Sequence, residues 1–198
     1  KNDGVSASVE GGSFGSFGAQ GRMQVAYAKG KWTHAYSASG GYKRSDGGTD
    51  NSDFEKGQGY GNLSFSYDQR FDIIAQLGIA TQSYGANTFY SAKYNNQYEK
   101  TDHGLASLNL SLHNQEKTWE IAPQFYYNKF KDHYQLIRGK AGAAAGENYH
   151  DLDVYGGGLN ANMAWALGKT AVGFDISKEC IYSTALGEEL AEKDYKDI

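Results

Sequence analysis

Several oxygen-bearing side chains lie close together between Ser45 and Glu55, in the segment SDGGTDNSDFE. The carboxylates of Asp46, Asp50 and Asp53 are hard oxygen donors of the kind that calcium selects. Their spacing does not follow the EF-hand pattern, in which ligands recur at fixed positions of the loop. The segment therefore predicts either a calcium-binding loop built on these three residues or a solvated acidic loop that binds no metal.

A second stretch whose residue types could bind a ligand, GANTFYSAKYNNQYEKTD, runs from Gly85 to Asp102. It mixes aromatic rings with amides and carboxylates. It lacks alternation, and a compact domain rarely carries so long an unpatterned loop without a function. Ring faces can pack on apolar ligand surface, and amides can orient a ligand by hydrogen bonds. Alternatively, the rings pack against one another and fold the loop. The candidate ligand-binding residues are Tyr84, Asn87, Phe89, Tyr90, Tyr94, Asn96 and Tyr98.

The remaining reactive side chains form no catalytic pattern. The five histidines are scattered along the chain, and no serine lies in the setting of a nucleophile elbow. The single cysteine, Cys180, excludes an internal disulfide framework and a cysteine-based zinc site. We therefore predict no catalytic residue, no enzyme activity and, apart from the calcium alternative, no cofactor.

The composition is typical of strands and turns. The 198 residues include 26 Gly and 16 Tyr but 1 Pro, and an aromatic fraction of 14% argues against disorder. The formal net charge of −4 gives no basic surface for nucleic acid. No apolar run is long enough for a transmembrane helix, and the mean hydropathy is −0.66. An outer-membrane barrel is compatible with these values, because its strands are polar on one face.

Long segments in which apolar and polar residues alternate predict β-strands with two different faces. In one of them, Leu108, Leu110 and Leu112 share a face. Pro123 removes one ladder hydrogen bond, so we expect a bulge or weak pairing there. The fold class is all-β, an antiparallel up-and-down meander that is a portion of a transmembrane β-barrel and curls or closes on itself. The nine predicted strands are Gly4–Phe14, Phe17–Ala28, Lys31–Lys43, Gln58–Tyr67, Phe71–Gln82, His103–His113, Thr118–Lys131, Asp151–Ala166 and Thr170–Ser183.

The connections differ in length between the two ends of this meander. KGK, DQR, NQEK and LGK predict tight turns, whereas Arg44–Gly57, Ser83–Asp102 and Asp132–His150 are longer links. Apart from a first hairpin at GSFG, short turns gather at one end and long loops at the other, as in transmembrane barrels. Aromatic residues flank the short turns, which indicates either a membrane-interface girdle or caps on the core of a two-sheet sandwich. The predicted girdle residues are Trp32, Tyr67, Phe71, Trp119 and Trp165.

Three segments in this order, Ala7–Gly47, Gly85–Thr101 and Tyr149–Glu188, carry a family resemblance. The first, which begins ASVEGGSFG, resembles the early barrel strands of TonB-dependent outer-membrane receptors. The second resembles one of their external loops, and the third a later hairpin. The resemblance implies a piece of a barrel of about 22 strands with a plugged lumen. Residues 1–198 are then one partial barrel segment, which follows a plug domain that this chain does not contain.

The resemblance further implies import of a scarce nutrient, such as a siderophore–iron complex, cobalamin or a glycan, across the outer membrane of a Gram-negative bacterium. The implied partners are the nutrient, membrane lipid and an inner-membrane energy-transducing protein that grips a region preceding the plug; nucleic acid is not among them. Two other function classes stay open: a passive porin-like or other ligand-binding outer-membrane barrel, and a soluble all-β interaction module. Two open sheet edges would allow the fragment to self-associate.

Overall fold

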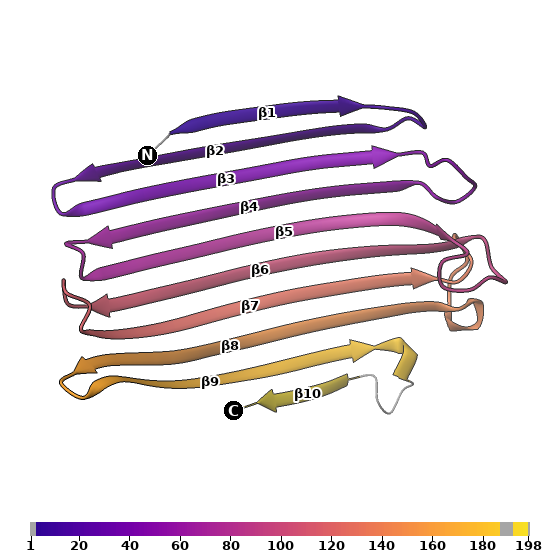
Figure 1. Ribbon diagram of the computed structural model, residues 1–198. Coiled ribbons are helices and arrows are strands. Elements are labelled where there is room, and N and C mark those ends of the chain that lie inside the picture. Colours follow the sequence, from indigo (N-terminus) through magenta and orange to yellow (C-terminus); the bar gives the residue numbers. More distant parts are fainter. Residues whose placement is uncertain (1–2, 187–191, 198) are drawn as a thin grey trace.

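A computed structural model describes residues 3–186 and 192–197 of the chain, which form one antiparallel sheet (Figure 1). Each strand pairs with the next along the chain, so the sheet is a meander without crossovers. Two short 3₁₀ helices, η1 (Ala143–Ala145) and η2 (Thr184–Leu186), lie in connections. No helix among the described residues is long and apolar enough to cross a membrane. The strands are β1 (Gly4–Gly11), β2 (Phe17–Lys29), β3 (Trp32–Ser45), β4 (Phe54–Tyr67), β5 (Phe71–Asn87), β6 (Gln97–His113), β7 (Trp119–Gln135), β8 (Glu147–Trp165), β9 (Gly168–Ser183) and β10 (Glu192–Asp197).

The predicted all-β meander is confirmed for the nine strands β1 to β9. The short strand β10 was not predicted, because its sequence EKDYKD lacks an alternation of apolar and polar residues. The strands β1 and β10 form the two edges of the sheet, which is not closed. Of the two expected alternatives, curling and closing into a smaller barrel, the described part of the chain shows a curved sheet that does not close.

The strands run further towards the long-loop end than the alternation predicts. The strand β5 continues to Asn87, β6 already begins at Gln97, β7 continues to Gln135, and β8 begins at Glu147. In these extensions both faces carry polar and aromatic side chains, so the period-two signal is lost while the ladder continues. The long loops shrink accordingly to residues 46–53, 88–96 and 136–146.

Tight connections join the strands at the opposite end of the sheet (Figure 1). In the turn from β4 to β5, Asp68 and Gln69 have positive φ angles of 52° and 55°. Two consecutive residues with positive φ are what a tight hairpin turn needs to match the twist of its strands. The Asp68 amide donates a hydrogen bond of 2.9 Å to the Lys31 carbonyl, and Lys31 Nζ lies 3.0 Å from Asp68 Oδ2. Neighbouring turns are thus fastened to each other.

Direct pairing across the ladder assigns the side chains to two faces of the sheet. Trp32, Tyr67 and Phe71 pair in one row across β3, β4 and β5, and we call their side the convex face. The opposite, concave face contains a cavity lined by residues of β1 to β7, so the sheet curves around it. Among the described residues, Ala86, 6% exposed, is the one fully buried apolar side chain. The described chain has no second sheet that could cover the convex face, as the sandwich alternative requires.

Pairing beside Pro123 is interrupted, as expected. The paired positions of β6 and β7 pass from Asn109–Gln124 directly to Leu112–Ile121. The register does not shift across this gap, so the bulge alternative is wrong and the weak pairing is confirmed. The missing N–H of proline removes a ladder hydrogen bond there without displacing the flanking residues.

Candidate functional site

The connections 46–53, 88–96 and 136–146 meet at one end of the sheet and form what we call the loop cap (Figure 1). Hydrogen bonds join them to one another and to the strand ends. Asn51 Nδ2 donates to the Gln97 carbonyl at 2.6 Å, and the Arg138 amide donates to the Asn96 carbonyl at 2.6 Å. The three loops therefore form one connected structure.

Arg138 provides the ionic link within the loop cap. Its guanidinium donates to both carboxylate oxygens of Asp53, at 2.6 and 3.0 Å, and to Asn51 Oδ1 at 3.1 Å. The same guanidinium lies over the ring of Tyr98, 4.9 Å from the centroid. A bidentate pair is the strong form of the arginine–carboxylate contact. The hydrogen bond from Arg138 holds the pKa of Asp53 below its usual range.

Gln97 fastens the loop 88–96 to the wall of the sheet. Its side chain is 0% exposed. Its Nε2 lies within hydrogen-bond distance of the carbonyls of Asn87 (3.0 Å), Ser91 (3.1 Å) and Tyr94 (2.7 Å). Its Oε1 accepts a hydrogen bond of 2.8 Å from the Tyr134 hydroxyl. An amide nitrogen has two hydrogens, so the three carbonyls share them.

The aromatic candidates of the loop cap pack largely on one another. The hydroxyls of Tyr84 and Tyr90 lie 2.9 Å apart, and the Tyr90 hydroxyl also donates to Glu99. The ring of Tyr90 meets the rings of Tyr134 and Phe89 edge-on, with centroid distances of 5.5 and 4.9 Å. The self-packing alternative therefore describes Tyr84 and Tyr90, whereas Phe89 keeps 81% of its surface exposed.

All seven predicted ligand-binding residues lie in or beside the loop cap. Phe89, Tyr90, Tyr94 and Asn96 belong to the loop 88–96. The expected loop position is wrong for the other three, because Tyr84 and Asn87 belong to β5 and Tyr98 to β6. The rings that the loop cap exposes to solvent are those of Phe89, Tyr90 and Tyr94.

The three carboxylates considered for calcium do not converge on one point. Asp46 pairs with Arg44 at 2.9 Å, and Asp53 pairs with Arg138. Asp50 contributes its carbonyl, which accepts a hydrogen bond of 3.1 Å from Asn87 Nδ2. Within the described residues, no group of three or more His, Cys, Asp or Glu side chains could hold a metal ion. This arrangement does not support the calcium interpretation, because arginines already pair with two of the three carboxylates.

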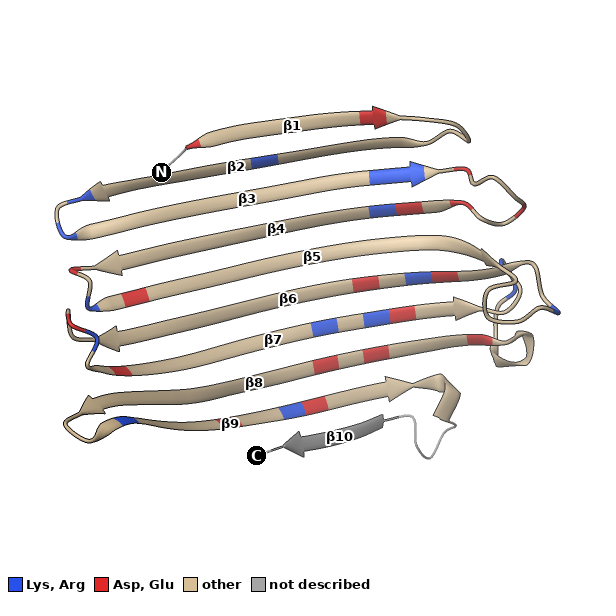
Figure 2. Ribbon diagram, in the orientation of Figure 1, with Lys and Arg blue, Asp and Glu red and all other residues tan. Residues whose placement is uncertain are grey.

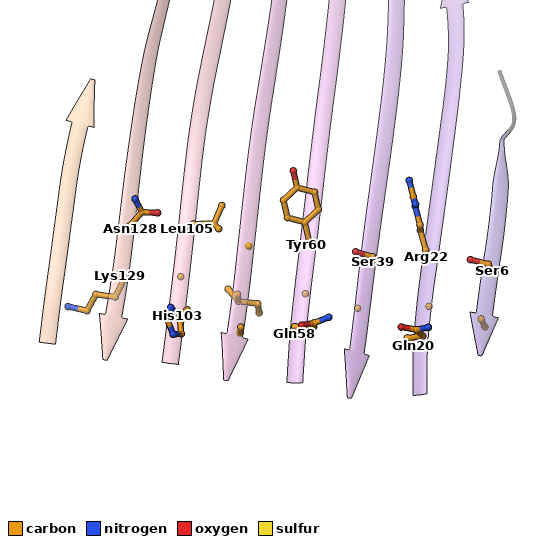
Figure 3. A pocket seen from close by; sticks show the side chains of 18 of the residues that line it. Ser6, Gln20, Arg22, Ser39, Gln58, Tyr60, His103, Leu105, Asn128 and Lys129 are labelled. Carbon is orange, nitrogen blue, oxygen red and sulfur yellow. The ribbon is translucent and has the colours of Figure 1, made fainter. Parts of the chain in front are cut away.

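The concave face contains a cavity of about 740 Å³ that the sequence did not predict. Figure 3 shows the side chains of Gln20, Arg22, Gln58, Tyr60 and Asn128 along its wall. Arg22 Nη2 donates to Gln24 Oε1 at 3.1 Å, and no carboxylate of the described residues forms an ion pair with Arg22. These polar side chains share the wall with the apolar side chains of Leu105 and Phe130, so the cavity suits a water-filled lumen or an occupant with both polar and apolar groups. The alternation predicted these polar positions, but the curvature that gathers them around one space has no local sequence signal.

A row of polar residues on the concave face resembles a catalytic triad in residue types. Ser183 Oγ lies 2.7 Å from His150 Nδ1, and His150 Nε2 lies 3.9 Å from Asp132 Oδ2. Ser183 is 2% exposed, so a substrate could not reach its hydroxyl. The separation of His150 and Asp132 is too long for the hydrogen bond that orients the histidine of a triad. We therefore assign no catalytic role to this row.

The five predicted girdle residues gather at the short-turn end of the convex face. The rings of Trp32 and Tyr67 have centroids 4.8 Å apart, and Tyr67 pairs with Phe71. Trp119 and Trp165 lie on the same face at the turn ends of β7 and β8. The four Trp and Tyr side chains are between 38% and 51% exposed.

A broad band without Lys, Arg, Asp or Glu extends from the girdle across the convex face. Figure 2 shows that charged residues concentrate towards the two ends of the strands and leave the middle of the sheet largely uncharged. The first charged convex-face residue beyond the girdle lies 12 residues from the aromatic in β3 (Trp32 to Arg44), 12 in β4 (Tyr67 to Glu55), 10 in β7 (Trp119 to Lys129) and 12 in β8 (Trp165 to Asp153).

Both borders of this uncharged band cross the ladder obliquely. One row of directly paired residues runs from Trp32 in β3 to Val172 in β9. The charged border lies 12 residues beyond this row at Arg44 but 6 residues beyond it at Lys178, a shift of about one residue per strand. The girdle shifts in the same sense, because Trp165 lies four residues past its row position. With a rise of about 3.3 Å and a strand spacing of about 4.8 Å, this shift corresponds to a tilt of roughly 35°.

Comparison with known proteins identifies the fold. No protein-family model and no curated protein matches the sequence. Among solved structures, the chain is similar to one described as "Copper transporter OprC", with a TM-score of 0.68 and 18% sequence identity. The similarity covers 90% of this chain and 28% of that chain, so this sheet has the fold of a part of a longer transporter.

Proposed function

We propose that this chain is a segment of the wall of an outer-membrane β-barrel transporter of a Gram-negative bacterium. We further propose that the whole protein is a TonB-dependent receptor that imports a scarce nutrient, of the siderophore–iron, cobalamin or glycan class. The observation that carries the proposal is the uncharged band of the convex face, whose two borders are parallel. A bilayer is bounded by two parallel planes, and strands of transmembrane barrels tilt by about 35–45°.

The width of the band supports the same conclusion. Twelve residues, the separation of Trp32 from Arg44, span about 40 Å along a strand, or roughly 33 Å along the membrane normal after tilting. This is enough for a hydrocarbon core of about 30 Å whose borders carry aromatic and charged residues. Leu77 and Ile79, in the middle of the face, are 63% and 71% exposed and would be favourably solvated by lipid.

The three function classes make different demands on the convex face. A soluble interaction module would have to cover it, and the described chain offers no element that does so. A porin-like barrel would carry the same uncharged band on its outer face, but it needs no energy source for transport. The fold similarity to a transporter and the connected loop cap support the receptor, with Phe89, Tyr94 and Asn96 as the accessible surface on which a ligand first lands. The energy-transducing partner would act through a part of the protein outside this chain.

Whole-cell labelling with a membrane-impermeant maleimide tests the membrane position. In a background in which Cys180→Ser removes the native thiol, Phe89→Cys in the loop cap should be labelled in intact cells. Gln115→Cys, in the short turn from β6 to β7, should be labelled only after the outer membrane is permeabilised. Equal labelling of both positions in intact cells would contradict the proposed orientation.

Uptake measurements separate the receptor from the passive barrel. Cells that express the protein should take up the cognate nutrient from a panel of labelled siderophores, cobalamin and oligosaccharides in an energy-dependent manner. Dissipation of the proton gradient should abolish uptake. Uptake that follows the external concentration and persists without the gradient would establish the passive barrel instead.

A further inference from the structure

We propose that the convex face binds the phosphate of an anionic phospholipid beside Lys29, at the turn from β2 to β3. The inference rests on the proposed membrane position, which places the short turns at the periplasmic leaflet. Lys29 and Trp32 pair directly across β2 and β3, so their side chains share the convex face. Lys29 is exposed, and no carboxylate of the described residues lies within ion-pair distance of its ammonium group.

The other two cations near this turn, Lys31 and Arg70, share one carboxylate of the protein, that of Asp68. Figure 2 shows the basic residues at the turn between β2 and β3. Lys31 Nζ lies 3.0 Å from Asp68 Oδ2, and Arg70 Nε lies 3.7 Å from the same oxygen. Among the described residues near this turn, Lys29 is therefore the cation that has no carboxylate within ion-pair distance. It lies at the level of the aromatic girdle, where lipid phosphates are found.

The aromatic neighbours of Lys29 on the convex face include ring nitrogens that the described residues leave without a hydrogen-bond partner. Tyr27 stacks on His34 with ring centroids 4.7 Å apart, and the Tyr36 hydroxyl lies 3.2 Å from His34 Nδ1. In the described part of the chain, neither Trp32 Nε1 nor His34 Nε2 has a hydrogen-bond partner. At the level of the lipid headgroups, an unused donor such as Trp32 Nε1 can bind a phosphate oxygen. Phosphate oxygens satisfy such donors and neutralise Lys29 at the same time.

The opposite end of the girdle shows the contrasting arrangement. Trp165 Nε1 donates to Thr170 Oγ1 at 3.0 Å, so this indole is satisfied within the protein. No lysine or arginine pairs with Trp165 across the ladder, since its partner is Gly168. Trp165 therefore resembles Trp32 in residue type and membrane level but lacks both the cation and the unused donor, which makes it a matched control.

Native mass spectrometry of the detergent-solubilised protein, titrated with phosphatidylglycerol and phosphatidylcholine of equal chain length, tests the proposal. The wild type should retain phosphatidylglycerol about fivefold more tightly than phosphatidylcholine, as one lysine near a lipid surface contributes about 1 kcal/mol. Lys29→Gln should abolish this preference, and Trp32→Phe should weaken it. The paired controls, Lys31→Gln and Trp165→Phe, should leave it unchanged.

The alternative results have distinct meanings. Equal retention of the two lipids by the wild type, or equal effects of Lys29→Gln and Lys31→Gln, would overturn the phospholipid site while the membrane-wall proposal stands. Failure of the protein to retain either lipid or to enter nanodiscs of either composition would overturn both. Correct folding of each variant is checked by the heat-dependent shift in electrophoretic mobility, so a misfolded variant is not scored as a lost site.

Discussion

Replacement of Gln97 by leucine should release the loop 88–96 from the wall of the sheet while the strands beneath it stay paired. Leucine has a similar volume but no polar atoms, so the change removes hydrogen bonds and leaves little cavity. The Nε2 contacts to three carbonyls, at 2.7 to 3.1 Å, are lost together with the bond from the Tyr134 hydroxyl. The loop carbonyls that lose this donor must then either open to water or remain unsatisfied.

The expected loss of local stability in Gln97→Leu follows from the number of hydrogen bonds that the two Nε2 hydrogens and Oε1 of Gln97 can make at one time. Three hydrogen bonds at about 1 kcal/mol each give about 3 kcal/mol of local stability, which corresponds to a roughly hundredfold change in the opening equilibrium of the loop. Global stability should change less, because the ladder between β6 and β7 continues past Gln97 from Tyr98 onwards. The effect is thus a change in local opening, as observed for loops held by a few buried contacts.

Hydrogen exchange read by mass spectrometry measures this opening directly. The amides of Phe89 and Tyr94 donate to the carbonyls of Ala86 and Ser91, at 2.7 and 3.2 Å, and should exchange about a hundredfold faster in Gln97→Leu. Gln115→Leu, at an exposed turn position, is the control and should leave the peptide 88–96 unchanged. The argument that Gln97 holds the loop would be refuted if these amides exchanged less than threefold faster in Gln97→Leu than in the wild type while the control behaved as expected.

Three further predictions concern the other loops of the cap. Arg138→Met, which keeps an unbranched side chain but removes the guanidinium and both of its bonds to Asp53, should speed exchange in residues 46–53 and 136–146 together by about tenfold or more, whereas independent loops would respond separately. The pKa of Asp53 is depressed, so the ion pair contributes its full stability above the unperturbed carboxyl pKa of 3.8 and loses it as the pH falls further. Protection of residues 46–53 from exchange should therefore drop in acid. Constant protection down to pH 2 would contradict the pairing. Gly146→Ala should disorder residues 136–146, since Gly146 has a φ of 75° and an added Cβ would lie 2.6 Å from Leu136 Cβ; unchanged exchange of that loop would show that the backbone adapts at no cost.

Alternation predicted most of the sheet because the convex face is uncharged across the band while the concave face carries polar residues, which gives each strand a period of two. The strand starting at Phe71 and the turns at Asp68 and Lys117 follow directly from it and from turn chemistry. The strand ends at Asn87 and Gln97 could not be predicted in this way, because above the band neither face is required to be apolar. The pattern loses its period there while the backbone ladder persists.

The site was harder to predict than the fold, because its contacts join residues that are distant in sequence. The acidic segment around Asp53 has the composition of a cation-binding loop, and its actual cation is the guanidinium of Arg138, 85 residues away. No local pattern indicates this pair. Likewise, Gln97 resembles any polar loop residue in the sequence, and its burial follows only from the way β6 and the loop 88–96 fold over it.

The lengths of the central strands explain how the loop cap is held. Strands β5, β6 and β7 have 17 residues each and β8 has 19, whereas about 9–11 tilted residues cross a bilayer. In the proposed membrane position, the excess of roughly seven residues per strand, at about 3.3 Å each, would raise a paired wall some 20 Å above the membrane surface after tilting. The loops are short in consequence, and their links through Arg138 and Gln97 attach to paired backbone. Under the proposed receptor function, a ligand that reached Phe89 would meet a surface that is already ordered, so less of its binding free energy would be lost to ordering the receptor.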